Sequence, residues 1–157
     1  MSKLTASRRT ALLGLAALAA LTGCGSGFDA SLPLADGTYR ASSEPDEEGA
    51  VGNITVVISG GVITGAEFVI VQRDGTLKDE DYGKGSDGQP IDDDYYKQAQ
   101  LAVQACETYS RQLLEVRDPG DVDVVSGATW AHDQFVAAAE DALRQAQTAV
   151  TATASGR

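Results

Sequence analysis

The sequence predicts an α+β domain in which two main helices pack on a small antiparallel sheet that contains a β-hairpin. Two β-rich runs flank Gly60-Gly61, and a Gly-Gly step between such runs is typical of a tight hairpin turn. Two later stretches, about 93–116 and about 130–148, repeat apolar residues every three or four positions, which is the period of an amphipathic helix. Because the strands come first and the helices later, we expect helices gathered on one face of the sheet.

The sheet is expected to contain three strands. The first covers 38–42, after a turn at Asp36-Gly37, and residues 53–58 and 62–71 form the hairpin. Within 53–58, alternate side chains lie on one face, as in a half-buried strand; they are Ile54, Val56 and Ile58. The polar stretch 72–94 contains two runs of three acidic residues, but their spacing does not match a calcium-binding EF-hand, so a solvated loop is expected.

The first helix, about 93–116, begins at Asp93 or Asp94, either of which can cap it, and is ended by Pro119-Gly120. Cys106 lies on its apolar stripe, which favours a buried small hydrophobe over a redox thiol. The second helix, about 130–148, presents an Ala-rich apolar face.

The N-terminus has the layout of a lipoprotein signal peptide, residues 1–23, with a basic start, an apolar run and then small residues before Cys24. The junction Leu21-Thr22-Gly23-Cys24 resembles a bacterial lipobox, which implies a diacylglyceryl group on Cys24. Export through the Sec or the twin-arginine route stays open. We therefore expect a tether over 24–35, a folded domain over 36–148 and a disordered tail over 149–157, anchored by lipid to the outer face of the cytoplasmic membrane.

The charge of the chain limits its partners. The formal net charge is −11, and loss of residues 1–23, which hold three basic and no acidic residues, would make it −14. A surface this acidic argues against binding nucleic acid and favours solubility or a basic protein partner. The chain has two cysteines, so lipidation of Cys24 would leave no intrachain disulfide.

The segment Asp123-Val-Val-Ser-Gly-Ala-Thr129 stands between the two helices. Small residues and hydroxyls at a helix start can form an anion site, because free N–H groups point outward there. Ser126 or Thr129 could equally be an ordinary N-cap.

The pattern Asp-x-x-Ser-Gly-Ala-Thr is similar to the flavinylation motif of the FMN-binding domain family, found in flavinylated subunits of sodium-pumping NADH:quinone oxidoreductases and in small exported flavoproteins. The likeness covers most of residues 36–147. It implies that a flavin transferase, using FAD and a divalent metal, attaches FMN through a phosphoester to Thr129. Recognition and phosphate-cradling roles are implied for Asp123, Ser126, Gly127 and Ala128.

The chain departs from the family directly after the motif, where it continues Trp130-Ala131-His132. Trp130 could stack on the isoalloxazine or pack in the core. His132, the sole histidine, could tune or protonate the flavin, or be a surface or capping residue.

These features favour an electron carrier over an enzyme with its own substrate, with no catalytic residue and no metal site. Its partners would be the membrane through Cys24, the transferase, and a redox partner in the membrane or in solution. One alternative is an FMN-dependent reductase with His132 or Tyr109 as proton donor, and another is a lipoprotein that carries no flavin.

Overall fold

The computed structural model describes residues 28–155, so the expected signal peptide, Cys24 and the start of the tether lie outside the described residues. These described residues form three strands, two long helices and one short 3-10 helix, and the predicted α+β class is confirmed. Within the described residues, no helix is long and apolar enough to span a membrane. The elements in chain order are β1 (Gly37–Ser42), β2 (Val51–Ser59), β3 (Val62–Val71), α1 (Asp93–Val116), η1 (Pro119–Asp121) and α2 (Thr129–Ser155).

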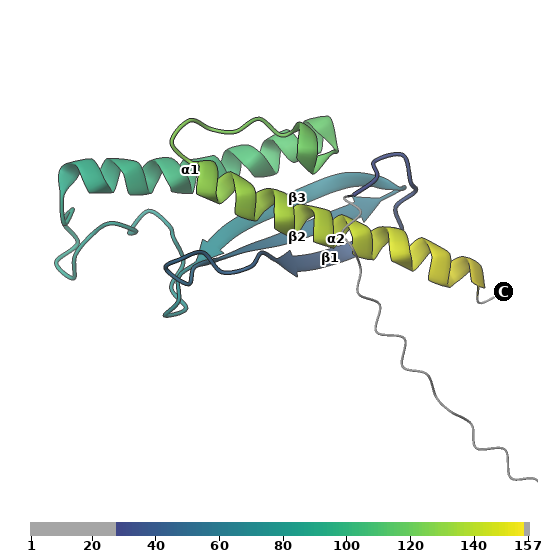
Figure 1. Ribbon diagram of the computed structural model, residues 1–157, viewed down its shortest axis with the longest axis horizontal. Coiled ribbons are helices and arrows are strands. Elements are labelled where there is room, and N and C mark those ends of the chain that lie inside the picture. Colours follow the sequence, from purple (N-terminus) through teal and green to yellow (C-terminus); the bar gives the residue numbers. More distant parts are fainter. Residues whose placement is uncertain (1–27, 156–157) are drawn as a thin grey trace, which may run out of the picture.

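The sheet is antiparallel in the order β1-β2-β3 (Figure 1). The predicted hairpin joins β2 to β3 through Gly60 and Gly61, which have φ values of +63° and +72°. Positive φ at both central residues suits a type I′ turn, and glycine adopts it without strain. The Asp36 carboxylate accepts a hydrogen bond of 2.8 Å from the Gly61 N–H, which ties the start of β1 to this turn and lowers the pKa of Asp36.

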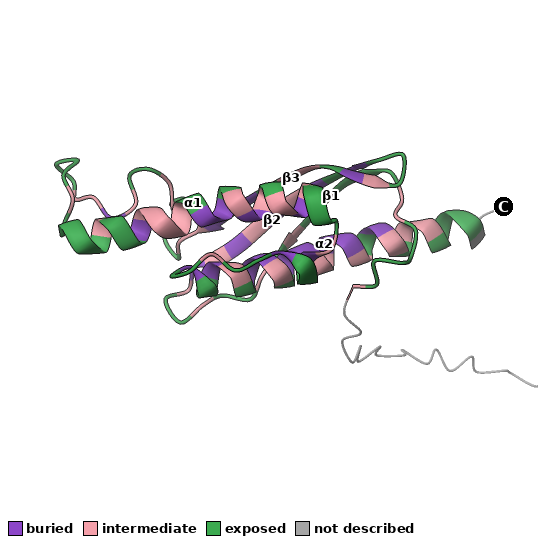
Figure 2. Cartoon of the chain, turned by 90° about the horizontal axis from the view of Figure 1, so that it is seen from above, coloured by how far each residue is buried: buried purple, intermediate pink, exposed green. Residues whose placement is uncertain are grey.

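Both helices cover one face of the sheet, α1 over β3 and α2 over β1 and β2 (Figures 1 and 2). The strand residues that face them are buried, as the alternating pattern in β2 predicted. An aromatic cluster joins the layers, since the Phe135 ring lies 5.3 Å from Phe68 and 5.4 Å from Tyr109, centroid to centroid. Buried small residues let α2 approach the sheet closely; they are Ala138, Ala139, Ala142 and Ala146.

Helix α1 has the predicted bounds, but its cap is Asp92 rather than Asp93 or Asp94. The Asp92 carboxylate accepts hydrogen bonds from the N–H groups of Asp94 and Tyr95 at 3.0 and 2.9 Å. The helix ends before the proline, where Arg117 adopts a left-handed conformation with φ of 63°.

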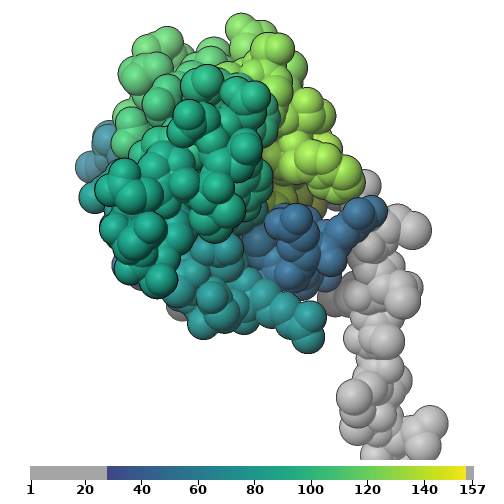
Figure 3. Space-filling model, turned by 90° about the vertical axis from the view of Figure 1, so that its left-hand side faces the viewer, coloured from purple at the N-terminus to yellow at the C-terminus, as the bar shows by residue number. Residues whose placement is uncertain are grey.

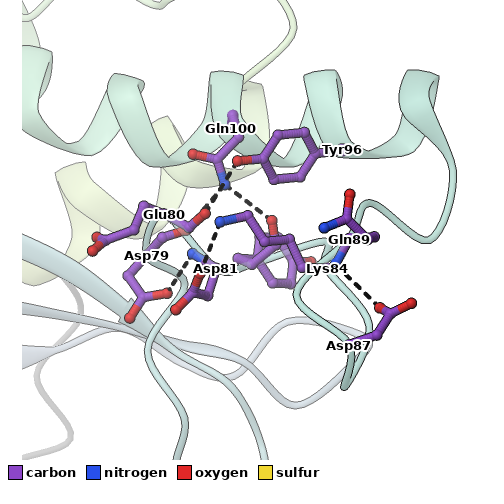
Figure 4. Close-up of polar contacts among 9 residues, drawn as sticks. Asp79, Glu80, Asp81, Lys84, Asp87, Gln89, Tyr96 and Gln100 are labelled. Carbon is purple, nitrogen blue, oxygen red and sulfur yellow. Dashed lines mark hydrogen bonds and ion pairs between the residues drawn. The ribbon is translucent and has the colours of Figure 1, made fainter.

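The acidic stretch 72–92 is an ordered loop that lies against α1 (Figure 4). The Gln100 amide donates to the carbonyls of Asp79 and Tyr82, at 3.1 and 3.0 Å, and the Tyr96 hydroxyl donates to the Glu80 carbonyl at 3.2 Å. In the part of the chain that the structure describes, no group of three or more His, Cys, Asp or Glu side chains could hold a metal ion.

Both ends of the folded part differ from expectation. Helix α2 continues to Ser155, so residues 149–155 are helical rather than a disordered tail. Alanine has the highest helix propensity, which favours this extension. The threonine hydroxyls find partners within the helix, since Thr151 bonds to the Thr148 carbonyl at 2.7 Å and Thr153 to the Ala149 carbonyl at 2.9 Å. Residues 28–35 are likewise no free tether, because Gln147 donates to the Asp29 carbonyl at 2.7 Å.

Candidate functional site

The motif forms the end of the loop that returns from η1 to the start of α2. No strand forms at 122–125, although Val122, Val124 and Val125 are of a residue type that favours strands. The loop closes with a turn in which the Ala128 N–H donates to the Val125 carbonyl at 2.9 Å, and Gly127 has φ of +84°. Helix α2 then begins at Thr129.

The first turn of α2 has no capping side chain. Its first helical hydrogen bond runs from the His132 N–H to the Ala128 carbonyl, at 3.0 Å. The N–H groups of Thr129, Trp130 and Ala131 have no acceptor among the described residues. Ala128, directly before the helix, has no side-chain oxygen with which to cap them. Such a start favours an anion, because unpaired N–H groups and the helix dipole both attract negative charge.

Side chains of α1 hold the motif loop in place. The Tyr109 hydroxyl, which is fully buried, donates to the Ala128 carbonyl at 3.1 Å and accepts from the Val125 N–H at 3.2 Å. Gln98 Nε2 donates to the Gly127 carbonyl at 2.7 Å, and Gln112 Oε1 accepts from the Asp123 N–H at 2.8 Å.

Sequence reasoning missed this supporting role of α1. The available signal was helical spacing: residues 98 and 109 are about three turns apart and 112 is one turn further, so the three share a face. That spacing alone could not say which segment the face meets.

Gly127 is the position in the motif that favours glycine most strongly. A Cβ there would lie 2.8 Å from Leu101 Cδ2, closer than real contacts allow. Its positive φ also lies in the left-handed region that side chains disfavour. The close approach of the loop to α1 therefore depends on this residue.

The other motif side chains divide into buried and exposed positions. Ala128 is buried, whereas Asp123, Ser126 and Thr129 are exposed. The Thr129 hydroxyl has no hydrogen-bond partner among the described residues, so it is accessible as an acceptor for a transferred group.

Trp130 lies on the surface, with 68% of its area exposed, and is therefore no part of the core. It lines an open cleft of about 250 Å³ together with Lys78 and the acidic residues Asp46, Glu47 and Glu48. Figure 3 looks onto this end of the molecule, where the start of α2, in yellow-green, lies beside loop 43–50, in blue.

Loop 43–50 is fixed to α2 one turn beyond Trp130. The buried side chain of Gln134 donates to the Ala50 carbonyl at 2.8 Å. The acidic wall of the cleft is therefore held at a set position relative to the motif. Local sequence patterns could not predict this contact, because its two residues are 84 positions apart.

His132 is directed at the motif loop. Its Nε2 lies 2.8 Å from the Val122 carbonyl oxygen, so this nitrogen carries the hydrogen. Its ring meets Tyr109 edge-on at 5.3 Å, and its Nδ1 lies 3.9 Å from an Asp133 carboxylate oxygen. His132 thus ties the start of α2 to the preceding loop through one backbone carbonyl, and its roles in capping or in tuning the flavin stay predictions.

Two further residues considered from the sequence are buried. Burial raises the pKa of Tyr109, and both hydrogen-bonding roles of its hydroxyl are occupied, so it is poorly placed to protonate a substrate. Cys106 is buried, as predicted, and burial raises the pKa of its thiol to about 12.

Comparisons with known proteins identify a family and structures of similar fold. The family model described as FMN-binding domain matches residues 49–144, which include the whole motif. A crystal structure of a protein from Clostridium perfringens is similar, with a TM-score of 0.59 and 24% identity, over 74% of this chain and 91% of that one. A solution NMR structure of a protein from Clostridium thermocellum matches with a TM-score of 0.43 and 26% identity, over 71% and 91%. No curated protein matches the chain.

Proposed function

Because the chain belongs to the FMN-binding domain family, whose cofactor is FMN, we propose that it carries FMN covalently on Thr129 and transfers electrons outside the cytoplasmic membrane. The bond would be a phosphoester between the FMN phosphate and the Thr129 hydroxyl, formed by a flavin transferase. A lipid on Cys24 would anchor the protein.

The observation that carries this proposal is the exposed Thr129 hydroxyl at a helix start that has no cap. A phosphoester keeps a negative charge, which the N–H groups of Thr129, Trp130 and Ala131 can stabilise. The residues present therefore fit the phosphate end of FMN. Tyr109 and Gln98 hold the loop so that these donors stay directed outward.

The cleft beside Trp130 fits the isoalloxazine end. An exposed indole one residue after the attachment point offers a flat surface for stacking. Lys78 is the one basic residue in the cleft lining, and it would lie close to the polar edge of the ring. When bound, FMN supplies the redox chemistry, while these side chains orient it and set the surrounding charge.

The open shape of the cleft favours an electron carrier over a reductase. The cleft of about 250 Å³ is open to solvent, so a ring bound there would not be covered by an enclosed pocket for a second, specific substrate. A ring edge in contact with water would allow electron exchange with a docked protein.

Attachment can be tested by co-expression with a flavin transferase, followed by denaturing electrophoresis under blue light. We expect a fluorescent band for the wild type and for Thr129→Ser, which keeps a hydroxyl. Thr129→Ala should give a dark band, whereas Thr148→Ala, which removes an exposed threonine hydroxyl from the same helix but outside the motif, should stay fluorescent. A dark wild-type band contradicts covalent attachment, and a fluorescent Thr129→Ala band moves it to another residue.

Anchoring is tested separately. Mass spectrometry of the mature protein should show a diacylglyceryl group on Cys24, and Cys24→Ala should release the protein from the membrane fraction. Retention of Cys24→Ala in the membrane would contradict the lipid anchor without affecting the flavin proposal.

A further inference from the structure

The motif and the beginning of the described chain lie toward opposite ends of α2 (Figure 1). Thr129 is the first residue of the helix, whereas Asp29 and Ala35 are hydrogen-bonded near its other end, to Gln147 and Ala146. Gln147 follows Thr129 by 18 residues, which at 1.5 Å per residue gives a separation of about 27 Å along the axis.

The segment 28–35 is part of the folded domain. Phe28 and Leu34 pack against the hydrophobic core, and the Tyr39 hydroxyl donates to the Ala35 carbonyl at 3.1 Å. Only three residues separate this segment from Cys24. From Cys24 to Phe28 the chain can reach at most about 14 Å, even when fully extended.

Charge is distributed unevenly between the two ends. Loops 43–50 and 72–92 and the start of α1 lie at the Thr129 end of the molecule (Figure 1). Loops 43–50 and 72–92, together with Asp93 and Asp94, hold twelve of the 23 acidic residues of the chain and three basic residues. An anionic membrane surface therefore repels the Thr129 end more strongly than the end that carries residues 28–35.

We propose that α2 acts as a strut that holds Thr129 and Trp130 away from the membrane, at the far end of the domain from the anchor. The flavin is then presented to a water-exposed protein rather than to a carrier dissolved in the lipid. This inference rests on the proposed anchor at Cys24 and the proposed attachment at Thr129.

Trp130 provides the test, because it is the single tryptophan of the chain and is exposed next to the attachment point. The full-length acylated protein, without flavin, is bound to vesicles of anionic phospholipid that contain a small fraction of dansyl-labelled headgroups. Energy transfer from Trp130 to dansyl reports how close this end comes to the membrane surface. We expect weak transfer.

The matched control carries Trp130→Phe together with Leu32→Trp. Leu32 is 49% exposed and lies in the segment bound to the far half of α2, so the introduced indole sits at the anchor end. We expect this variant to transfer several-fold more energy than the wild type. Equal transfer from both proteins would show that the domain lies flat, and would overturn the strut and favour a lipid-dissolved partner.

The failure of this inference can be distinguished from failure of its premises. Flotation with the vesicles reports anchoring, so a protein that does not float overturns the anchor and the arrangement together. A protein that floats with equal transfer overturns the arrangement alone. Because energy transfer is measured on the apoprotein, the distance between Trp130 and the membrane is tested even if flavin attachment at Thr129 fails.

Discussion

Replacing Tyr109 with phenylalanine removes one oxygen atom and tests how α1 positions the motif. The ring is fully buried among the core residues, so its volume is conserved and no cavity forms. The lost hydroxyl is the shared partner of the Ala128 carbonyl, at 3.1 Å, and of the Val125 N–H, at 3.2 Å. Tyr109→Phe therefore leaves the Val125 N–H without a partner. It also removes one of the two hydrogen bonds that the Ala128 carbonyl accepts, while the bond from the His132 N–H at 3.0 Å remains.

The expected loss of stability follows from these two groups. The Ala128 carbonyl keeps its bond from the His132 N–H, so it loses only one net hydrogen bond, worth about 0.5–1.5 kcal/mol. The Val125 N–H loses its partner, but Val125 is partly exposed, so its cost lies near the lower end of the range of about 1–3 kcal/mol for an unpaired polar group. Together they predict a fall of about 1.5–3 kcal/mol in the free energy of unfolding.

The assay is urea unfolding of the apoprotein followed by circular dichroism, with Tyr39→Phe as the matched control. Tyr39 also donates one hydrogen bond to a backbone carbonyl, at 3.1 Å, but it is only partly buried, so a loss of no more than about 1 kcal/mol is expected. Tyr109→Phe should also slow flavin attachment, because the motif loop loses its support while Thr129 is unchanged. Equal unfolding free energies for the two variants would refute the reasoning.

Three other predictions concern the same region. Gly127→Ala should lower the unfolding free energy by about 1–3 kcal/mol, because a left-handed φ disfavours a side chain. Adding Leu101→Ala should recover only the part of this loss that the steric clash causes, and urea unfolding of both variants provides the check. Because burial raises the pKa of Cys106 to about 12, from a usual value near 9, folding holds the thiol protonated; this contribution is complete below pH 9 and is lost as the pH rises toward 12. Cys106→Ala should accordingly lose less stability than the wild type between pH 8 and 10, and thermal melts across that range provide the check. Trp130→Ala should raise the flavin fluorescence of the loaded protein several-fold by removing a stacked quencher, whereas Trp130→Phe should raise it less; unchanged fluorescence in both would place the ring elsewhere.

The elements that local chemistry determines could be predicted from the sequence. Gly60-Gly61 is one such case, because two adjacent residues with positive φ fix the hairpin regardless of the rest of the fold. The cap of α1 could not be chosen, since Asp92, Asp93 and Asp94 are chemically equivalent as caps. The end of α2 was missed for a related reason. Alanine favours a helix there and threonine does not, and the contacts of residues 28–35 with Gln147 that support the helix are invisible in local sequence.

The site divides in the same way. The residues of the proposed attachment motif are continuous in the sequence and can be recognised together, but the side chains that position the motif come from distant parts of the chain. Gln98 lies 29 residues from Gly127, and Gln134 lies 84 residues from Ala50. Glutamine is ordinary on a helix surface, so nothing in its identity indicated these roles. The cleft beside Trp130 is likewise built from a loop whose acidic composition suggested only solvation.

The contrast between the two helix starts explains why the motif ends in Ala-Thr. Helix α1 begins with Asp92, whose carboxylate occupies the first N–H groups, and such a cap is worth about 1 kcal/mol. A similar side chain before α2 would compete with a phosphate for the same donors. Ala128 supplies no such oxygen, and its carbonyl is instead held by Tyr109 from the core side. The start of α2 is thus supported from inside the protein, which leaves its outward N–H groups free for the charge that a phosphoester on Thr129 would bring.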